Sequence, residues 1–241
     1  MLTAETEARL EQAKALENNY QPLPEVADQL ADKTLIMIVA PACMGKSALI
    51  ETAAKTNPDF GVVPVFTTRD SRPDDDRAAF RFVPHSDESI AQLLAKIENR
   101  EVIQYVIHPT LGRIYGTELS DYQKPYNLLA TVSTVAQHLR SLPFGRTLVI
   151  CIVTEPETWK RWLLARYPEP SEERTKRIAE AVQSLEWSLA QPESDVLWLN
   201  NRDGELAVTT ERLIGQARGE TGSDSEARAI AQQCLELAKT L

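Results

Sequence analysis

The chain has 241 residues, 43% of them hydrophobic, and a formal net charge of −9. This length is sufficient for a substantial buried core. No apolar run approaches the roughly 18 residues that span a bilayer, and nucleic-acid-binding proteins generally carry a basic surplus, so both membrane insertion and nucleic-acid binding are disfavoured. The acidic, helix-like start lacks the basic region of a signal peptide, so we expect a cytoplasmic protein.

Most of the net negative charge comes from the two ends of the chain. Residues 1–32 contain seven acidic and two basic residues, and residues 219–241 contain four acidic and two basic residues. Pro22 and Pro24 separate an N-terminal helix from the core, and residues 219–224 resemble a linker to a terminal helix. We therefore expect helical extensions over 1–32 and 219–241, which either pack against the core or bind a second copy or a partner protein.

A phosphate-binding loop is indicated by the run LIMIVAPACMGKSALI, residues 35–50. Residues 35–39 are typical of a buried parallel strand, and the residues from Ser47 onward are typical of a helix start. A helix N-terminus directs free backbone N–H groups at phosphate, Lys46 adds a charge, and Ser47 offers a hydroxyl to Mg²⁺. Ala40 replaces the first glycine of the usual pattern, and a loop that merely ends a strand is the alternative.

This loop leads us to expect ATP and Mg²⁺ as cofactors, with Ser47 as the metal ligand. The expected ATP-binding residues of the loop are Ala40, Pro41, Ala42, Cys43, Met44, Gly45, Lys46, Ser47 and Ala48. A thiol at Cys43, near a helix start and Lys46, can become reactive, and an inert loop residue is the alternative. The three cysteines have no metal-like spacing and do not indicate a disulfide framework.

The rest of the core alternates between strand-like and helix-like segments. Strands are predicted at 62–67, 102–107, 113–115, 127–132, 147–153 and 196–199, and helices after Ser86, near Glu118 and at 133–141, 155–166, 171–190 and 205–218. This alternation predicts an α/β fold with a parallel sheet flanked by helices on both faces. The strands between residues 62 and 115 indicate a smaller inserted lobe.

Arginines cluster in two places, at positions 69, 72, 77 and 81 and at positions 161, 166, 174 and 177. Arg69 and Arg72 flank a proline-containing turn. Because guanidinium forks match phosphate oxygens, this pair can hold a monophosphate in position for attack. A solvated loop balanced by the three aspartates at 74–76 is the alternative.

The chain resembles the guanylate kinases over roughly residues 34–218. The resemblance rests on the phosphate loop, TTRxxRP at 67–73, Phe80 and Phe82, YGT at 115–117, and the arginine-rich helical pair, which occur in that order. It implies a P-loop NTPase fold with a core domain over 33–218, a monophosphate-binding lobe at about 62–122 and lid helices at about 155–190. It also implies transfer of the γ-phosphate of ATP to GMP or a related monophosphate.

The resemblance further implies roles for individual side chains. The acceptor would be bound by Arg69, Arg72, Phe80, Gln104, Tyr115 and Thr117. Lid arginines that stabilise the transferring phosphoryl group match Arg166 and Arg177, with Arg161 shifted by one place. The implied catalytic set is therefore Lys46, Arg69, Arg72, Arg161, Arg166 and Arg177. The asparagine that faces adenine corresponds to Asn200 or Asn201.

Several positions depart from the family pattern. The guanine-reading glutamate of the family aligns with Gln104, a serine of the acceptor lobe aligns with Val65, and the acidic positions of the middle strand are Ala130 and Val132. Lost acceptors weaken guanine recognition, because buried donors without partners cost about 1 to 3 kcal/mol each. Two alternatives therefore stand beside a guanylate kinase-like enzyme: a non-catalytic protein-binding module, and a kinase for a sugar phosphate such as ribose 1,5-bisphosphate.

Overall fold

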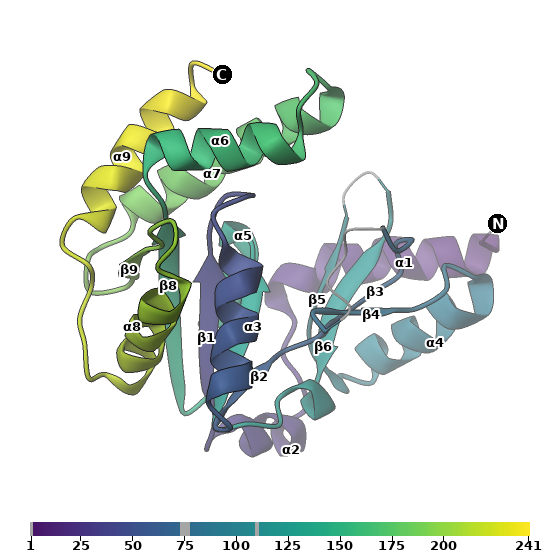
Figure 1. Ribbon diagram of the computed structural model, residues 1–241. Helices are drawn as coiled ribbons and strands as arrows, with labels where there is room; N and C mark the ends of the chain where they lie inside the picture. The colour runs from purple at the N-terminus through teal and green to yellow at the C-terminus, as the bar shows by residue number, and fades with distance from the viewer. Residues whose placement is uncertain (1, 73–77, 109–110) are drawn as a thin grey trace.

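The computed structural model describes residues 2–72, 78–108 and 111–241. They form a parallel sheet between two layers of helices, with a smaller second sheet beside it (Figure 1). The predicted α/β fold is thus confirmed. Arg77 and the three aspartates at 74–76 lie outside the described residues.

The strands are β1 Thr34–Val39, β2 Phe60–Val62, β3 Val65–Thr67, β4 Phe80–Phe82, β5 Val102–Ile107, β6 Ile114–Glu118, β7 Tyr126–Thr131, β8 Arg146–Val153 and β9 Leu197–Asn200. The α-helices are α1 Ala4–Leu16, α2 Pro24–Ala27, α3 Lys46–Thr56, α4 Asp87–Glu98, α5 Ser133–Leu139, α6 Pro156–Arg166, α7 Glu172–Ala190, α8 Leu206–Arg218 and α9 Ala227–Ala238.

The main sheet has the strand order β2-β7-β1-β8-β9, and all of its pairs are parallel. Strand β1 lies in the middle, and every residue of it after Thr34 is buried. Leu35 and Met37 pack in one cluster with residues of α5, α7 and α9, whereas Ile36 and Ile38 pack in another with residues of α3 and α8. This two-sided burial explains the continuous apolar run that precedes the phosphate loop.

The second sheet has the order β4-β3-β6-β5 and forms the small lobe. One of its faces is covered by α1 and α4 (Figure 1), and Phe66 and Tyr105 pack there in one cluster with helix residues such as Leu94. Because side chains alternate along a strand, the other face is shared by residues one position away, including Thr67 and Gln104.

Two predictions of local structure are wrong. The segment 62–67 is not one strand, because β2 joins the main sheet and β3 joins the small lobe, with the crossing at Val63 and Pro64. Pro64 has no N–H for a strand ladder, which makes it a suitable break point. The helix predicted near Glu118 is only a 3₁₀ turn, Leu119–Asp121, in which Glu118 and Asp121 cap each other's backbone.

Both terminal segments are helical, as predicted, and both pack against the rest of the chain. Helix α1 lies against α4, and Arg9 binds Glu98 through two hydrogen bonds of 2.8 Å. Helix α9 lies against α6 and α7, with Ala231 and Cys234 fully buried. Their apolar residues therefore serve the chain's own core. Within the described ranges no helix is long and apolar enough to cross a bilayer.

Candidate active site

The phosphate loop connects β1 to α3, with Gly45 as the residue that caps α3. Gly45 has a φ of 79°, in the left-handed region that favours glycine. A Cβ at this position would also collide with the side-chain nitrogen of Asn201, which donates a 3.0 Å hydrogen bond to the carbonyl of Met44. The asparagine after β9 therefore fixes the loop, and glycine is required at the contact.

Helix α6 holds the same loop from the other side. The indole N–H of Trp159 donates a 2.9 Å hydrogen bond to the carbonyl of Ala42. Between these two anchors, Cys43 has a φ of 64°, a conformation that costs a non-glycine residue about 1 to 2 kcal/mol. Burial raises the pKa of the Cys43 thiol, although Arg166 opposes this shift. The thiol is therefore protonated near neutral pH, as expected for an inert loop residue.

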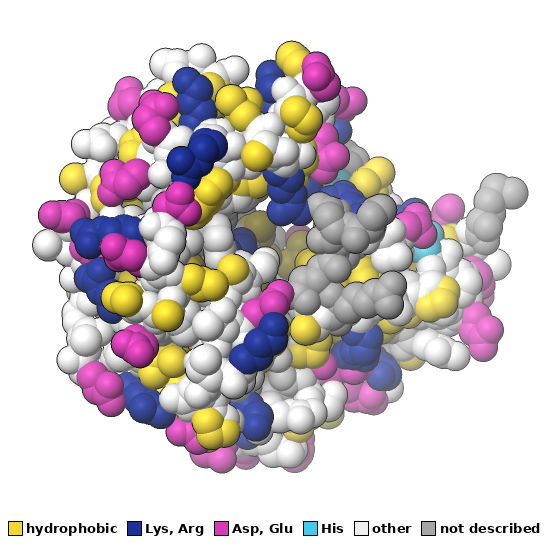
Figure 2. Space-filling model, in the orientation of Figure 1, with side chains coloured by type: hydrophobic (Ala, Val, Ile, Leu, Met, Phe, Trp, Pro, Cys, Tyr) yellow, Lys and Arg dark blue, Asp and Glu magenta, His cyan; other side chains and the backbone are white. Residues whose placement is uncertain are grey.

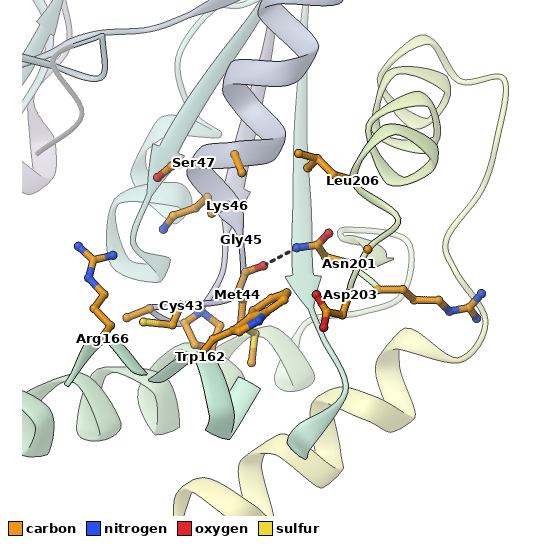
Figure 3. Close-up of a pocket in the computed structure, with 15 residues that line it drawn as sticks. Cys43, Met44, Gly45, Lys46, Ser47, Trp162, Arg166, Asn201, Asp203 and Leu206 are labelled. Atoms are coloured by element: carbon orange, nitrogen blue, oxygen red, sulfur yellow. Dashed lines mark hydrogen bonds between the residues drawn. The ribbon is translucent and has the colours of Figure 1, made fainter. Parts of the chain in front are cut away.

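The loop lines a pocket of about 540 Å³ (Figure 3). Figure 3 shows the loop between Arg166 on one side and Asn201 and Leu206 on the other. The pocket is formed by the phosphate loop, helix α6 and the segment after β9. Its lining residues are Pro41, Ala42, Cys43, Met44, Gly45, Lys46, Ser47, Ala48, Trp162, Arg166, Asn201, Arg202, Asp203, Gly204 and Leu206.

Lys46 lies at the start of α3, where its ammonium group donates to the carbonyl of Ala40 at 3.5 Å. Burial lowers the pKa of Lys46 to about 8, and the nearby carboxylate of Glu180 in α7 opposes this shift. The hydrogen bond that the ammonium group of Lys46 forms with Ala40 is therefore weak. An anion in the pocket would favour its charged form.

The three lid arginines of the predicted site lie in different surroundings. Arg166 lines the pocket. Arg177 donates to Glu180 at 2.8 Å and to Glu173 at 3.2 Å, both on its own helix. Arg161 donates to Asp203, which lines the pocket, and therefore lies at its rim. Of the three, only Arg166 reaches the pocket wall directly.

The two arginines of the small lobe, Arg69 and Arg72, have different neighbours. The guanidinium of Arg69 lies 4.8 Å from the ring centre of Phe80 and 5.1 Å from that of Phe82. Arg72 forms an ion pair of 3.8 Å with Glu173 of α7, so this contact joins the small lobe to the lid. Figure 2 shows a hollow beneath the lid with basic side chains at its edge.

The remaining predicted residues lie away from the pocket. Tyr115 and Thr117 are on β6, and Gln104 is opposite Thr117 on β5. The side-chain amide of Asn200 donates to Glu155 at 3.2 Å, so of the two candidate asparagines only Asn201 lines the pocket.

Sequence reasoning missed several residues around the pocket. Trp159 anchors the loop, and Trp162 lines the pocket one turn later on the same face of α6, a spacing of three that could have indicated a shared role. Asp203 and Gly204 belong to the segment Leu199–Gly204 that follows the last strand, so their position after Asn201 was a usable signal. No pattern in the sequence indicated Leu206.

The chain was compared with known proteins. No family model matches the chain. The guanylate kinase of Escherichia coli strain K12 is 29% identical over 202 residues, covering 78% of this chain and 89% of that protein, and the guanylate kinase of Shigella sonnei strain Ss046 matches equally well. The chain is thus similar to guanylate kinases over 78% of its length and divergent from them in sequence.

Solved structures with partial similarity include two kinases. A guanylate kinase from Anaplasma phagocytophilum has 16% identity and a TM-score of 0.47, covering 86% of this chain and 96% of that one. A polyphosphate kinase 2 from Arthrobacter aurescens TC1 has 13% identity and a TM-score of 0.38, covering 97% of this chain and 87% of that one.

Relative to the guanylate kinase pattern, the chain diverges at the end of β7, beside the phosphate loop. Ala130 is the fifth residue of β7, and Val132, just after the strand, is 61% exposed. Neither side chain can bind a metal or accept a hydrogen bond. The described residues contain no group of three His, Cys, Asp or Glu side chains that could hold a metal ion.

Proposed function

We propose that the protein is an ATP-dependent kinase that transfers the γ-phosphate of ATP to a nucleoside monophosphate. The observation that carries this proposal is the pocket at the start of α3, where Gly45, Lys46 and Ser47 meet Arg166 of the lid and Asn201. Lys46 and Arg166 in this wall suit a nucleoside triphosphate, because backbone N–H groups, a helix N-terminus and cationic side chains all favour phosphate.

ATP fits the residues present. Gly45 adds no side chain to the pocket beside the loop backbone, and Lys46 has a weak protein partner at 3.5 Å. Trp162 and Leu206 supply apolar surface in the same pocket. Ser47, exposed at the first turn of α3, would hold Mg²⁺, which neutralises charge on the phosphates when bound.

The small lobe would hold the acceptor. Arg69 and Arg72 would bind its phosphate, and one oxygen of that phosphate attacks the γ-phosphorus of ATP. The new P–O bond forms as the bond between the γ-phosphorus and the bridging oxygen breaks, and ADP leaves. Arg166 and Arg177 would stabilise the charge of the moving group once Arg177 exchanges its carboxylate partners for phosphate.

The test is ADP release from ATP and Mg²⁺ with GMP, IMP, AMP, CMP, UMP or ribose 1,5-bisphosphate as the acceptor. We expect turnover with at least one nucleotide and a loss of about 100-fold or more in Lys46→Ala, because removing one transition-state donor costs about 10² to 10³ in kcat. Lys55→Ala is the matched control, since Lys55 is an exposed lysine of the same helix that pairs with Glu51. Full activity of Lys46→Ala contradicts the proposal.

If the folded protein releases no ADP with any acceptor, the result would instead favour a non-catalytic binding module. Turnover with ribose 1,5-bisphosphate alone would favour a sugar-phosphate kinase. A cytoplasmic location and a dimer or partner contact through the terminal segments stay predictions.

A further inference from the structure

Residues 17–33, called the strap below, connect the small lobe to the main sheet. The chain also crosses between the two sheets at Val63 and Pro64, and again between β6 and β7. The strap is a further connection, because one of its ends lies on β5 and the other lies in the core of the main sheet. It precedes the range 34–218, over which the chain resembles the guanylate kinases, so the resemblance assigns it no role.

The first end of the strap covers the outer edge of β5, which is the last strand in the order of the small sheet. Glu17 accepts a 2.9 Å hydrogen bond from the N–H of Ile107, and the hydroxyl of Tyr20 donates at 2.8 Å to the carbonyl of Val102. These bonds satisfy backbone groups at both ends of an edge strand. The ring of Tyr20 also packs edge-on against Tyr105, with 4.9 Å between the ring centres. This end of the strap therefore moves with the small lobe.

Arg100, which lies between α4 and β5, holds the next residues of the strap. Its guanidinium donates to the carbonyls of Gln21 at 2.8 Å and Pro22 at 3.0 Å. Its own carbonyl accepts a 2.9 Å hydrogen bond from the N–H of Leu23. Arg100 has a φ of 59°, in the left-handed region that residues with a Cβ rarely adopt. An unfavourable backbone conformation is thus kept at the residue that contacts the strap three times.

The second end of the strap is part of the core of the main sheet. Leu30 is fully buried in one cluster with Leu35 of β1 and Val149 of β8. The N–H of Gly145, directly before β8, donates to the carbonyl of Leu30 at 3.2 Å, and a Cβ at Gly145 would collide with the carbonyl of Ala31. This end of the strap therefore moves with the main sheet.

Between its two ends the strap is short and stiff. Helix α2, which has Pro24 at its start, is followed at once by the 3₁₀ turn Asp28–Leu30, and residues 17–33 contain no glycine. Helical turns have a fixed rise of about 1.5 to 2.0 Å per residue, so this part of the strap has no slack. A cavity of about 450 Å³ is lined by residues 28, 29, 32 and 33 of the strap and by Leu119 and Tyr122 of the crossing between β6 and β7. The strap therefore holds the two sheets through its ends.

We propose that the strap positions the small lobe, and that it thereby sets the distance between the acceptor arginines and the phosphate loop. The proposal rests on the proposed function. Figure 1 shows α2 at the end of the main sheet opposite the phosphate loop, whereas Arg72 reaches Glu173 of α7. A small rotation of the lobe about the strap would therefore displace Arg69 and Arg72. The phosphate-loop pocket is lined by residues within 41–48 and 162–206, so ATP binding does not depend on the strap.

The test lengthens the strap in the full-length chain. Insertion of Gly-Ser-Gly-Ser between Ala27 and Asp28 keeps the contacts of both ends and adds slack between them. We expect KM for the acceptor identified by ADP release to rise about tenfold, because a small misplacement of binding groups is costly, and KM for ATP to change less than twofold. The same insertion after Glu193, in the exposed turn between α7 and β9, is the matched control and should leave both values within twofold.

A second measurement needs no phosphoryl transfer. Spin labels on Glu88→Cys in α4 and Glu211→Cys in α8, both at exposed positions, report the distances between the small lobe and the main sheet. Cys43→Ser removes the partly exposed native thiol, and Cys151 and Cys234 are buried. The distance distribution should broaden at least twofold in the strap insertion and stay unchanged in the control. Broadening in a protein without turnover would reject the proposed kinase and retain the positioning role of the strap.

An unchanged distance distribution in the folded insertion variant would overturn the inference, as would equal rises in both KM values or an acceptor KM that stays within twofold. If the insertion prevents folding, Arg100→Gly replaces it, because glycine adopts a φ of 59° without strain and only the guanidinium contacts are lost. The acceptor KM should then rise about threefold, and no rise would again overturn the inference. Arg9→Gln is the control, since Arg9 binds Glu98 within the small lobe.

Discussion

The phosphate-loop pocket and the small lobe differ in how their functional groups are held. In the pocket, the loop is fixed by two anchors from distant elements, Asn201 on Met44 and Trp159 on Ala42. In the small lobe, Arg69 lies over two phenylalanine rings and Arg72 pairs with Glu173 at 3.8 Å. Triphosphate binding would thus use a rigid loop, whereas acceptor binding would use side chains that exchange partners.

The difference also extends to chemistry. The pocket keeps the Gly-Lys-Ser sequence that is typical of a phosphate-binding loop. The small lobe keeps its arginines but has Gln104 where the family that the chain resembles has a carboxylate, and the end of β7 in the main sheet has Ala130 and Val132 where that family has acidic residues. Divergence has therefore concentrated on the part that would choose the acceptor.

The sharpest test of this division is a change in the small lobe alone. Arg69→Gln should raise KM for the acceptor about 10- to 100-fold and leave ATP affinity unchanged, because hydrogen bonds to a charged group contribute about 1.5 to 3 kcal/mol. Steady-state kinetics with each substrate varied in turn measures both effects. Arg9→Gln, a change to an arginine that binds Glu98 far from the cleft, is the control. Equal losses for both substrates would abolish the distinction between the two regions.

A smaller effect, on the free energy of unfolding, should come from the buried ammonium group of Lys46. Because burial lowers the pKa of Lys46 to about 8 in the folded state, the unfolded chain binds more protons between about pH 8 and pH 10.5. Lys46 therefore reduces the free energy of unfolding below pH 8, and this reduction disappears as pH rises toward 10.5. We expect Lys46→Met to be more stable than the wild type at pH 7.

This gain should decline as pH rises through that window. Urea unfolding of both proteins at pH 7, 8, 9 and 10 measures it, and the difference between them cancels the contributions of the other titrating groups. A difference that stays constant with pH would mean that the ammonium group is not buried in solution.

The smallest expected effect concerns the loop backbone. Cys43→Gly removes a left-handed conformation from a residue with a Cβ, so the free energy of unfolding should rise by about 1 kcal/mol. Thermal unfolding measures it, with Cys151→Ala as a comparison that should lower stability because Cys151 is a buried core residue of β8. A loss of stability in Cys43→Gly would show that the thiol contributes more packing than the strained backbone costs.

The sequence predicted the main sheet well, because its strands are continuous apolar runs and its helices have one apolar face. The phosphate loop was equally predictable, since its residues are adjacent in the chain. The strand at 62–67 was misjudged because periodicity says nothing about which sheet a strand joins. Only the proline at position 64 marked the change of sheet.

Contacts between distant segments could not be predicted. The hydrogen bond from Trp159 to Ala42 joins residues 117 positions apart, and the pairing of Arg161 with Asp203 joins residues 42 positions apart. Such contacts depend on how α6 lies over the carboxyl end of the sheet, which no local pattern specifies. Sequence also could not distinguish Asn200 from Asn201, because a single residue decides which side chain faces the pocket.

Helix α9 holds one end of each of the two helices that were predicted to form a lid, α6 and α7. Helix α9 crosses the bases of α6 and α7 (Figure 1), and Cys234 is buried in one cluster with Trp159 and Leu185. The halves of α6 and α7 that hold Trp159 and Leu185 are therefore packed into the same core as the strands of the main sheet. If α6 and α7 move when a ligand binds, the turns around Tyr167 and Pro168 would move more than these buried inner halves, so Arg166 would move while Trp159 stays with the phosphate loop.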